Sequence, residues 1–333
     1  MEPSGTRIPI SPPTIAPVEV QDNRPLWSIM IPAYNCTGYL TDAILSVLAQ
    51  DMGESLMQIE VVDDASTDGD VAALVAELGK GRVQYYRQPV NVGSLRNFET
   101  CINRSRGHYV HLLHGDDRVL TGYYARMTQL FELYPQAGAA FCSHACIDWA
   151  GTRNHIPTPI KGAGILSNWL VRIAERQQIQ YVSIAVRREV YERLGSFYGT
   201  NYGEDWEMWV RIARYYPMAY TPEILAEYRG HDLSISAVTV QQGRIIEDLL
   251  FVMDAIQQHL PDKDKRRVAM LSRRLYATLG IGAAYQVVRK THDWSLAKDH
   301  ANRTLTMSRH PSVYYHLLKF NIKVLLHRYT SLI

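Results

Sequence analysis

The sequence predicts an α/β fold in which a mainly parallel central sheet is flanked by helices and followed by a helical C-terminal region. Short apolar runs alternate with amphipathic helical segments from Trp27 to about residue 143. The connections between these segments are short, as they are in βαβ units. From about residue 239 onward the apolar spacing is helical, and only Pro261 and Pro311 interrupt it. These three observations indicate the fold class.

Each element follows from its local pattern. Buried strands are expected where short, partly β-branched apolar runs occur, at residues 27–32, 59–62, 83–86, 109–113 and 139–143. Helices are expected where apolar residues recur every three or four positions, at residues 39–49, 66–78, 94–103 and 123–133. Ser66 and Thr67 are good cap residues for the second of these helices. The pattern is looser after residue 143, with helices expected over 168–175 and 188–194.

We expect three regions, namely a tail over residues 1–25, an α/β domain over 26–238 and a helical region over 239–333. The tail holds six of the 15 prolines of the chain. Each proline fixes φ and removes a backbone donor, so the tail is expected to be extended and flexible. An arm that recognises a partner is the alternative interpretation.

Composition excludes several classes of protein. Of the 333 residues, 47% are hydrophobic and 20% are charged, which is typical of a globular protein and not of a disordered one. The formal net charge is only +2, so no nucleic-acid partner is expected. Four cysteines are too few for a disulfide framework. With no apolar stretch of membrane-spanning length, we expect a soluble, cytoplasmic protein.

Acidic pairs follow two of the predicted strands. Asp63 and Asp64 end the second strand, and Asp116 and Asp117 come just after the fourth. Ligands of open parallel sheets bind beyond the carboxyl ends of the strands, so both pairs are expected at one edge. Clustered carboxylates repel each other unless a hard cation such as Mg²⁺ or Mn²⁺ lies between them. For either pair alone, a solvated turn is the simpler interpretation; together they favour a cation site.

A third acidic group, Gly203-Glu204-Asp205-Trp206, precedes an apolar stripe of helical spacing. Carboxylates in a first helical turn are a normal response to the helix dipole. A carboxylate held at a helix start can also point into a cleft and act as a general base. Both interpretations stay open on the residues alone.

Six motifs, taken in order, resemble family 2 glycosyltransferases of the GT-A fold. They are Ser28–Asn35 (SIMIPAYN), Val61–Asp68 (VVDDASTD), Asn91–Gly93 with Arg96 and Asn97, Leu113–Asp117 (LHGDD), Gly203–Trp206 (GEDW) and Tyr228–His231 (YRGH). The resemblance covers residues 27 to about 236. Each motif alone is weak, whereas six in the right order are highly specific.

The resemblance implies a donor site. Pro32 and Tyr34 would line the pocket for the nucleotide base, and Asp64 would accept a hydrogen bond from that base, typically uracil. Arg96 would lie near the nucleotide, and Asp116 would contact the ribose or the sugar.

The resemblance also implies a catalytic site. Asp117 would bind the metal, Mg²⁺ or Mn²⁺, that bridges the donor's diphosphate, and His231 would help to hold both as a loop closes. Asp205 would deprotonate the acceptor hydroxyl, giving displacement with inversion at the anomeric carbon. The family's acidic motif often begins with another Asp, where this chain has His114.

The activity implied by the resemblance is transfer of a sugar from a nucleotide-diphospho-sugar, a UDP-sugar above all, to a saccharide or lipid-linked acceptor. Such enzymes often act in surface polysaccharide or glycoconjugate synthesis. The Gln-x-x-Arg-Trp signature of processive synthases is not intact, because Ile245 stands where Trp is needed. Transfer of a single sugar is therefore expected. An inactive nucleotide-sugar-binding scaffold and a glycoside hydrolase are the alternatives.

Two other groupings of metal-binding residue types are set aside. On a strand, His108 and His114 face one side and His111 the other, so the three cannot converge. Cys142 and Cys146 lack the second pair of ligands that a zinc site needs.

The last predicted helix, from Val313 to Arg328, combines apolar and basic residues. The apolar ones are Val313, Leu317, Leu318, Phe320, Val324 and Leu325, and the basic ones are His316, Lys319, Lys323 and His327. Such a helix can lie on an anionic membrane surface, which would place the protein at the inner face of the membrane. It can equally pack its apolar face on the domain or on a second subunit of a homodimer.

Overall fold

The structure is a computed structural model that describes residues 6–19, 23–241 and 244–330, without the side chains of residues 240, 241 and 327–330. It divides into two compact units. The first extends to Trp169 and resumes over Gln178–His231, and the second comprises Leu170–Gln177 and the chain from Asp232 onward. The α/β unit therefore ends at His231, seven residues before the expected boundary at 238.

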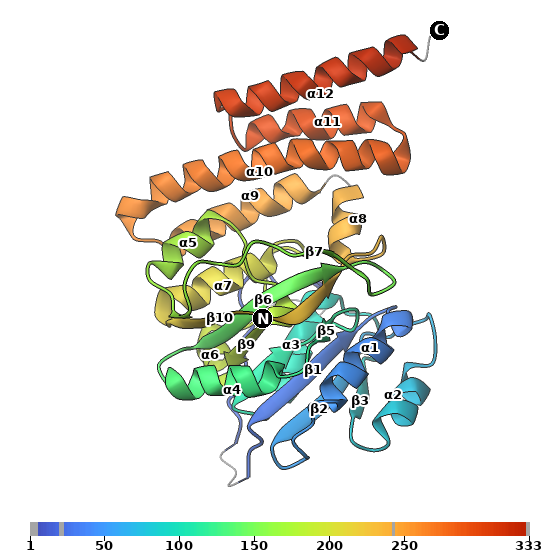
Figure 1. The fold of residues 1–333 in the computed structure, drawn as a ribbon, viewed down its shortest axis with the longest axis vertical. Coiled ribbons are helices and arrows are strands. Elements are labelled where there is room, and N and C mark those ends of the chain that lie inside the picture. Colours follow the sequence, from blue (N-terminus) through green and yellow to red (C-terminus); the bar gives the residue numbers. More distant parts are fainter. Residues whose placement is uncertain (1–5, 20–22, 242–243, 331–333) are drawn as a thin grey trace. The chain divides into compact units, whose positions relative to one another are not determined.

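The first unit is built on one ten-stranded sheet with the order β3-β2-β1-β4-β9-β6-β10-β5, in which β7 pairs with β6 and β8 with β10 (Figure 1). The strands are β1 Trp27–Ala33, β2 Met57–Asp63, β3 Gln84–Arg87, β4 Tyr109–Leu112, β5 Arg118–Val119, β6 Ala139–Ile147, β7 Arg153–His155, β8 Gly164–Ile165, β9 Ile184–Arg187 and β10 Met218–Arg229. The first four strands pair in parallel, as expected. Beyond β4 the sheet is mixed, because β9 pairs antiparallel with both β4 and β6.

Helices connect these strands. They are α1 Thr37–Leu48, α2 Val71–Gly79, α3 Ser94–Arg104, α4 Tyr123–Leu133, the 3-10 turn η1 Tyr181–Ser183, α6 Arg188–Leu194 and α7 Glu204–Tyr215. The helices predicted in this part of the chain are confirmed. The predicted cap of α2 is wrong: Asp70 caps it, accepting a hydrogen bond from the Ala73 N–H at 2.9 Å. Ser66 instead accepts one from the Asn35 N–H, which ties the ends of β1 and β2 together.

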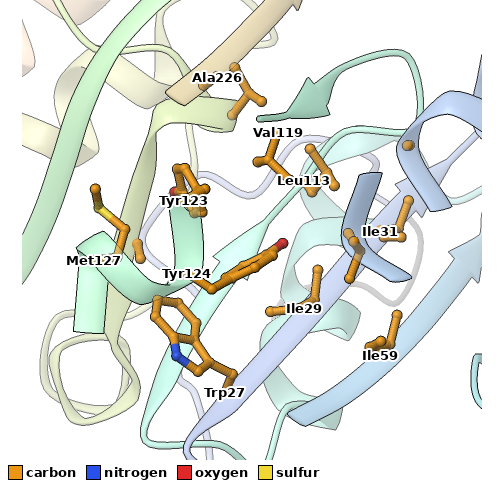
Figure 2. Close-up of a cluster of buried hydrophobic side chains, with 14 of the residues drawn as sticks. Trp27, Ile29, Ile31, Ile59, Leu113, Val119, Tyr123, Tyr124, Met127 and Ala226 are labelled. Carbon is orange, nitrogen blue, oxygen red and sulfur yellow. The ribbon is translucent and has the colours of Figure 1, made fainter. Parts of the chain in front are cut away.

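Apolar side chains of β1, β2 and α4 form the core of this unit. Every residue of β1 and β2 is buried, which suits central strands covered on both faces. Figure 2 shows Trp27, Ile29 and Ile31 along β1, with Tyr124 and Met127 of α4 beside them. The Trp27 and Tyr124 rings meet edge to face at 5.2 Å. This core anchors the strands whose ends carry the acidic residues.

Gly107 is a position at which a side chain would clash with the backbone of β1. A Cβ there would lie 2.5 Å from both the Ser28 nitrogen and the Trp27 carbonyl carbon, which are backbone atoms that cannot rotate away. We expect Gly107→Ala to lower the free energy of unfolding by about 3 kcal/mol, at the upper end of overpacking costs. Urea denaturation followed by circular dichroism measures this. Gly38→Ala, which adds the same methyl in open space on α1, should change stability by less than about 1 kcal/mol; equal losses in both variants would contradict this account.

Residues 6–19 differ from the flexible tail that was expected. They are extended but packed on the first unit, with Ile15 buried. The Pro13 carbonyl accepts a hydrogen bond from the Ser196 N–H at 2.9 Å, and the Pro9 carbonyl accepts one from Gly199 at 2.8 Å. Prolines keep the segment extended and leave its carbonyls available for such contacts. Residues 1–5 and 20–22 of the predicted tail lie outside the described residues.

The second unit is helical, as expected for the end of the chain. Its elements are α5 Trp169–Glu175, whose first residue belongs to the first unit, α8 Ile235–Gln241, α9 Ile245–Ile256, η2 Gln257–His259, α10 Asp262–Thr291, α11 Trp294–Arg303, η3 Thr304–Thr306 and α12 Pro311–Thr330. The long helix α10 packs against α9, α11 and α12 (Figure 1). Over the stretches that the structure covers, no helix combines the length and the apolarity needed to cross a bilayer.

Candidate functional site

The strand order reverses between β1 and β4. The chain runs from β1 outward to β2 and β3 on one side, and then returns to place β4 on the other side of β1. Open α/β sheets bind ligands at such a switch point, in the crevice beyond the carboxyl ends of the strands. Here the segments that follow Ala33 and Leu112 lie at the switch point.

The segment after β4 is held tightly against β1. The Leu113 N–H donates to the Met30 carbonyl at 3.0 Å, and the Gly115 N–H donates to the Pro32 carbonyl at 3.2 Å. A Cβ on Gly115 would lie 2.7 Å from the Cys36 sulfur, so a side chain there would displace the segment. Pro32 is buried in β1, and its carbonyl thus positions the acidic motif.

Three side chains of this segment form a cluster that could hold a metal ion. One ligand atom each of His114, Asp116 and Asp117 lies within 4.8 Å of the other two. His114 Nε2 is buried and has no hydrogen-bond partner. An imidazole nitrogen and two carboxylates are donors that Mn²⁺ accepts, and an unpartnered buried nitrogen is costly unless something binds it. The residues present therefore fit a divalent ion.

His231 contacts this cluster through Asp116. Its Nε2 lies 2.9 Å from Asp116 Oδ2, whereas its Nδ1 is buried without a partner. The cluster thus differs from the predicted ligand pair of Asp117 and His231: it brings in His114, and His231 holds Asp116. From the sequence, His114 is a departure from the family pattern and one of three histidines that were set aside as a metal site.

The two neighbouring carboxyls have opposite pKa shifts. Burial raises the pKa of Asp117 well above its usual range, and the negative charge of Asp116 adds to this. For Asp116 burial acts in the same direction, but the hydrogen bond with His231 and the electrostatic interactions with His114 and His231 outweigh it, so its pKa is lowered. The elevated pKa of Asp117 is what a carboxyl shows when it is buried beside another acid without a cation.

Arg229 links the acidic motif to helix α1 and to the loop after β6. The backbone N–H of Arg229 donates to Asp117 Oδ1 at 2.8 Å, and its side-chain Nε donates to the Asp116 carbonyl at 2.8 Å. Its other guanidinium nitrogens reach Asp42, at 2.7 Å, and the carbonyls of Asp148 and Trp149. The sequence places Arg229 within a motif but does not indicate its role, because its partners lie far away in the chain.

The first acidic pair is engaged in local contacts. Asp63 pairs with Arg87 and accepts a hydrogen bond from the Tyr85 hydroxyl at 2.8 Å. The expectation that both acidic pairs gather around one cation without nearby basic residues is therefore wrong for Asp63. In the described residues, the metal cluster contains the second pair only.

Asp64 organises the turn at residues 91–93. Its carboxylate accepts hydrogen bonds from the Val92 N–H at 2.7 Å, the Gly93 N–H at 2.9 Å and the Asn91 amide at 2.9 Å. Burial raises the pKa of Asp64, and the two backbone N–H groups and the charge of Arg7 oppose that shift. Asp64 was predicted to contact the nucleotide base, and the structure places it beneath this turn.

Arg96 lines a pocket of about 600 Å³ beside the same turn. Its Nη1 pairs with Glu99 at 2.8 Å, and its Nε donates to the Thr6 carbonyl at 3.1 Å. Arg7 also lines the pocket and donates to the Asn91 side chain. The N-terminal segment therefore forms one wall of this pocket, which no sequence motif indicated. Tyr34, predicted to line the pocket for the nucleotide base, is 50% exposed and directly follows β1.

The third acidic group is connected to the metal cluster through aromatic rings. The Tyr181 ring lies 4.4 Å from that of His114, and the Tyr181 hydroxyl donates to Glu204 at 3.1 Å. Asp205 follows in the first turn of α7, half-buried, with Oδ1 accepting from the Trp206 N–H at 2.7 Å. Gly203 caps the start of this helix with φ of 87°, a left-handed conformation that only glycine adopts readily.

His111 is a buried core residue, with Nδ1 3.2 Å from the Tyr124 hydroxyl and Nε2 3.1 Å from the Val182 carbonyl. Burial lowers its pKa to about 3. Cys142 and Cys146 are free thiols, and burial raises the pKa of Cys142 to about 12.

The sequence profile of Glycosyl transferase family 2 matches residues 28–192. The chain belongs to this family. The matched range includes the switch point, the acidic cluster and the turn at Asp64. A protein of Mycobacterium tuberculosis is 27% identical to this family 2 chain over 250 residues, which cover 68% of this chain and 74% of the relative.

Solved structures show the same fold. Residues 1–349 of TarS from Staphylococcus aureus, in complex with UDP-GlcNAc, match with a TM-score of 0.61 and 16% identity over 84% of this family 2 chain and 81% of that chain. The mannosyltransferase PcManGT of Pyrobaculum calidifontis, in complex with GDP-Man and Mn²⁺, matches with a TM-score of 0.53 and 16% identity over 90% and 89% of the two chains. At this identity the likeness establishes the fold alone, which is the predicted GT-A fold.

Proposed function

We propose that the protein transfers a single sugar from a nucleotide-diphospho-sugar to an acceptor hydroxyl, with inversion at the anomeric carbon. The observation that carries the proposal is the cluster of His114, Asp116 and Asp117 at the switch point of the sheet. The family match supports the reaction class, and the UDP-GlcNAc and GDP-Man bound to the two similar structures support the class of donor.

In this proposal the donor's diphosphate lies beside the cluster. His114, Asp116 and Asp117 would hold Mg²⁺ or Mn²⁺, and such an ion stabilises the negative charge that develops on a diphosphate leaving group. Arg229 positions Asp116 and Asp117, and His231 orients Asp116. The nucleoside would extend toward Tyr34, Asp64 and the pocket that Arg96 lines.

In this proposal Asp205 acts as the general base. Its carboxylate accepts the proton of the acceptor hydroxyl, whose oxygen bonds to the anomeric carbon of the sugar. The bond from that carbon to the diphosphate oxygen breaks, and the nucleoside diphosphate leaves with the electron pair. The attack comes from the face opposite the leaving group, so the configuration inverts. We further propose UDP as the nucleotide, and a saccharide or lipid-linked acceptor used in surface polysaccharide or glycoconjugate synthesis.

Calorimetric titration tests the donor site. The purified protein is titrated with UDP, GDP and dTDP, each with and without Mn²⁺. We expect one nucleotide, UDP, to bind more tightly when Mn²⁺ is present, because an ion held by His114, Asp116 and Asp117 would offset the negative charge of the diphosphate. Asp117→Asn should lose the Mn²⁺-dependent part of this affinity. If a folded protein binds none of the three, the site is not a donor site and the proposed transferase activity is wrong.

A further inference from the structure

Helix α12 is apolar on two opposite faces. One face is buried within the second unit and consists of Val313, Leu317, Phe320 and Val324. It packs against α10 and α11, and the Phe320 ring meets that of Tyr285 on α10 at 4.9 Å. The expectation that an apolar face of this helix packs on protein is thus confirmed for these four residues. This packing does not explain the apolar residues Leu318 and Leu325, which are exposed.

The opposite face carries a second set of apolar residues, which we call the outer stripe. Its members are Tyr314, Tyr315, Leu318, Ile322, Leu325 and Leu326, each between 46% and 64% exposed. At 100° per residue they fall within a sector of about 120°, on the side of the helix away from the buried face. A contiguous exposed apolar patch of this kind is typical of an interaction surface.

The outer stripe has basic residues along one edge and no acidic residue near it in the sequence. Lys319 and Lys323 are exposed and follow one another along that edge. Lys319 Nζ lies 4.3 Å from the centre of the Tyr315 ring. After Asp299 the chain contains no Asp or Glu at all, whereas Lys or Arg occurs at positions 303, 309, 319, 323 and 328.

We propose that the outer stripe of α12 binds the surface of an anionic lipid bilayer. Apolar side chains flanked by lysines are the arrangement that interfacial helices use: the apolar groups enter the acyl boundary, and the lysines meet the lipid phosphates. Tyrosines suit this depth because the ring is apolar and the hydroxyl is polar. The assignment goes beyond the proposed transferase activity and does not depend on it.

A second copy of the chain fits this face less well. In an antiparallel two-fold helix pair, the lysine edge of one copy faces the lysine edge of the other. The residues after Asp299 offer no carboxylate to neutralise those charges, and like charges brought together oppose association. Anionic lipids supply the missing negative charge.

Sedimentation with lipid vesicles tests the proposal on the full-length protein. We expect binding to vesicles of phosphatidylcholine mixed with phosphatidylglycerol, weak binding to phosphatidylcholine alone, and release at about 1 M salt, where charges are screened within about 3 Å. The double variant Leu318→Glu/Leu325→Glu should bind at least about 100-fold more weakly. Lys319→Gln/Lys323→Gln should lose about 30-fold, and only toward the anionic vesicles.

Leu133→Glu is the matched control, because Leu133 is 59% exposed on α4 in the first unit. Its vesicle binding should equal that of the unchanged protein, and circular dichroism should show all variants folded. The proposal is overturned if the protein ignores both vesicle types or binds both equally. It is also overturned if light scattering shows a dimer that Leu318→Glu/Leu325→Glu converts to a monomer while vesicle binding is absent.

Discussion

The Asp205→Asn variant should transfer sugar roughly 10²–10⁴-fold more slowly than the unchanged protein and bind nucleotide with the same affinity. The amide cannot accept the proton of the acceptor hydroxyl, whereas its size and its place at the start of α7 are retained. Turnover of the donor identified by calorimetry measures the rate, and titration with the nucleotide measures binding. Slow turnover with unchanged nucleotide binding indicates loss of the base, whereas weaker nucleotide binding indicates a damaged donor site.

Glu204→Gln is the matched control for this experiment. Glu204 is the preceding residue, and its Oε1 accepts a hydrogen bond from Tyr181 at 3.1 Å, which the glutamine oxygen can also accept. We therefore expect this variant to lose much less activity than Asp205→Asn. Full turnover by Asp205→Asn would exclude Asp205 as the base. A large loss of activity confined to Glu204→Gln would assign the role of base to Glu204.

Replacing Arg229 by methionine should destabilise the protein by about 3–5 kcal/mol, the usual cost of removing one partner from a buried charged network. The Arg229 side chain is only 1% exposed. Its loss leaves the carbonyls of Asp116, Asp148 and Trp149 without this donor. Urea denaturation measures the change. Mn²⁺ affinity should fall about 10–100-fold, because the acidic segment would lose the group that holds it in place.

Arg153→Met serves as the control, since Arg153 is 49% exposed and shares its partner Glu227 with Arg118. Its stability should change by no more than about 1 kcal/mol. If Arg229→Met does not fold, Arg229→Lys keeps the charge with fewer well-placed donors and should show a smaller loss of Mn²⁺ affinity in a folded protein. Unchanged unfolding and unchanged Mn²⁺ binding in the Arg229 variants would contradict the role assigned to this residue.

Much of the first unit could be predicted because its signals are local. The strands β1, β2 and β4 contain short apolar runs, which are typical of strands buried on both faces. The strand β10 was missed, because Pro222 and Glu223 interrupt its apolar residues where its pairing with β6 shifts register. A strand with such an irregularity has no simple alternation to recognise.

The N-terminal segment shows a different limit of sequence reasoning. Its prolines correctly indicated an extended backbone, but extension does not decide whether a segment is free. Its carbonyls meet N–H groups of Ser196 and Gly199, about 180 positions later in the chain. No pattern within the first 25 residues carries that information.

The sequence by itself determined the order of the strands β1 to β4 and the helices α1 to α4, together with the positions of the acidic motifs. Apolar spacing and motif identity are properties of neighbouring residues. Tertiary structure alone decided the partner of each acid. Asp63 pairs with Arg87, Asp64 with the turn at 91–93, and Asp116 with His231, 115 positions away. These pairings depend on distances and burial that arise only when the strand ends meet at one edge of the sheet. They leave His114 Nε2 without a hydrogen-bond partner beside the carboxylates of Asp116 and Asp117.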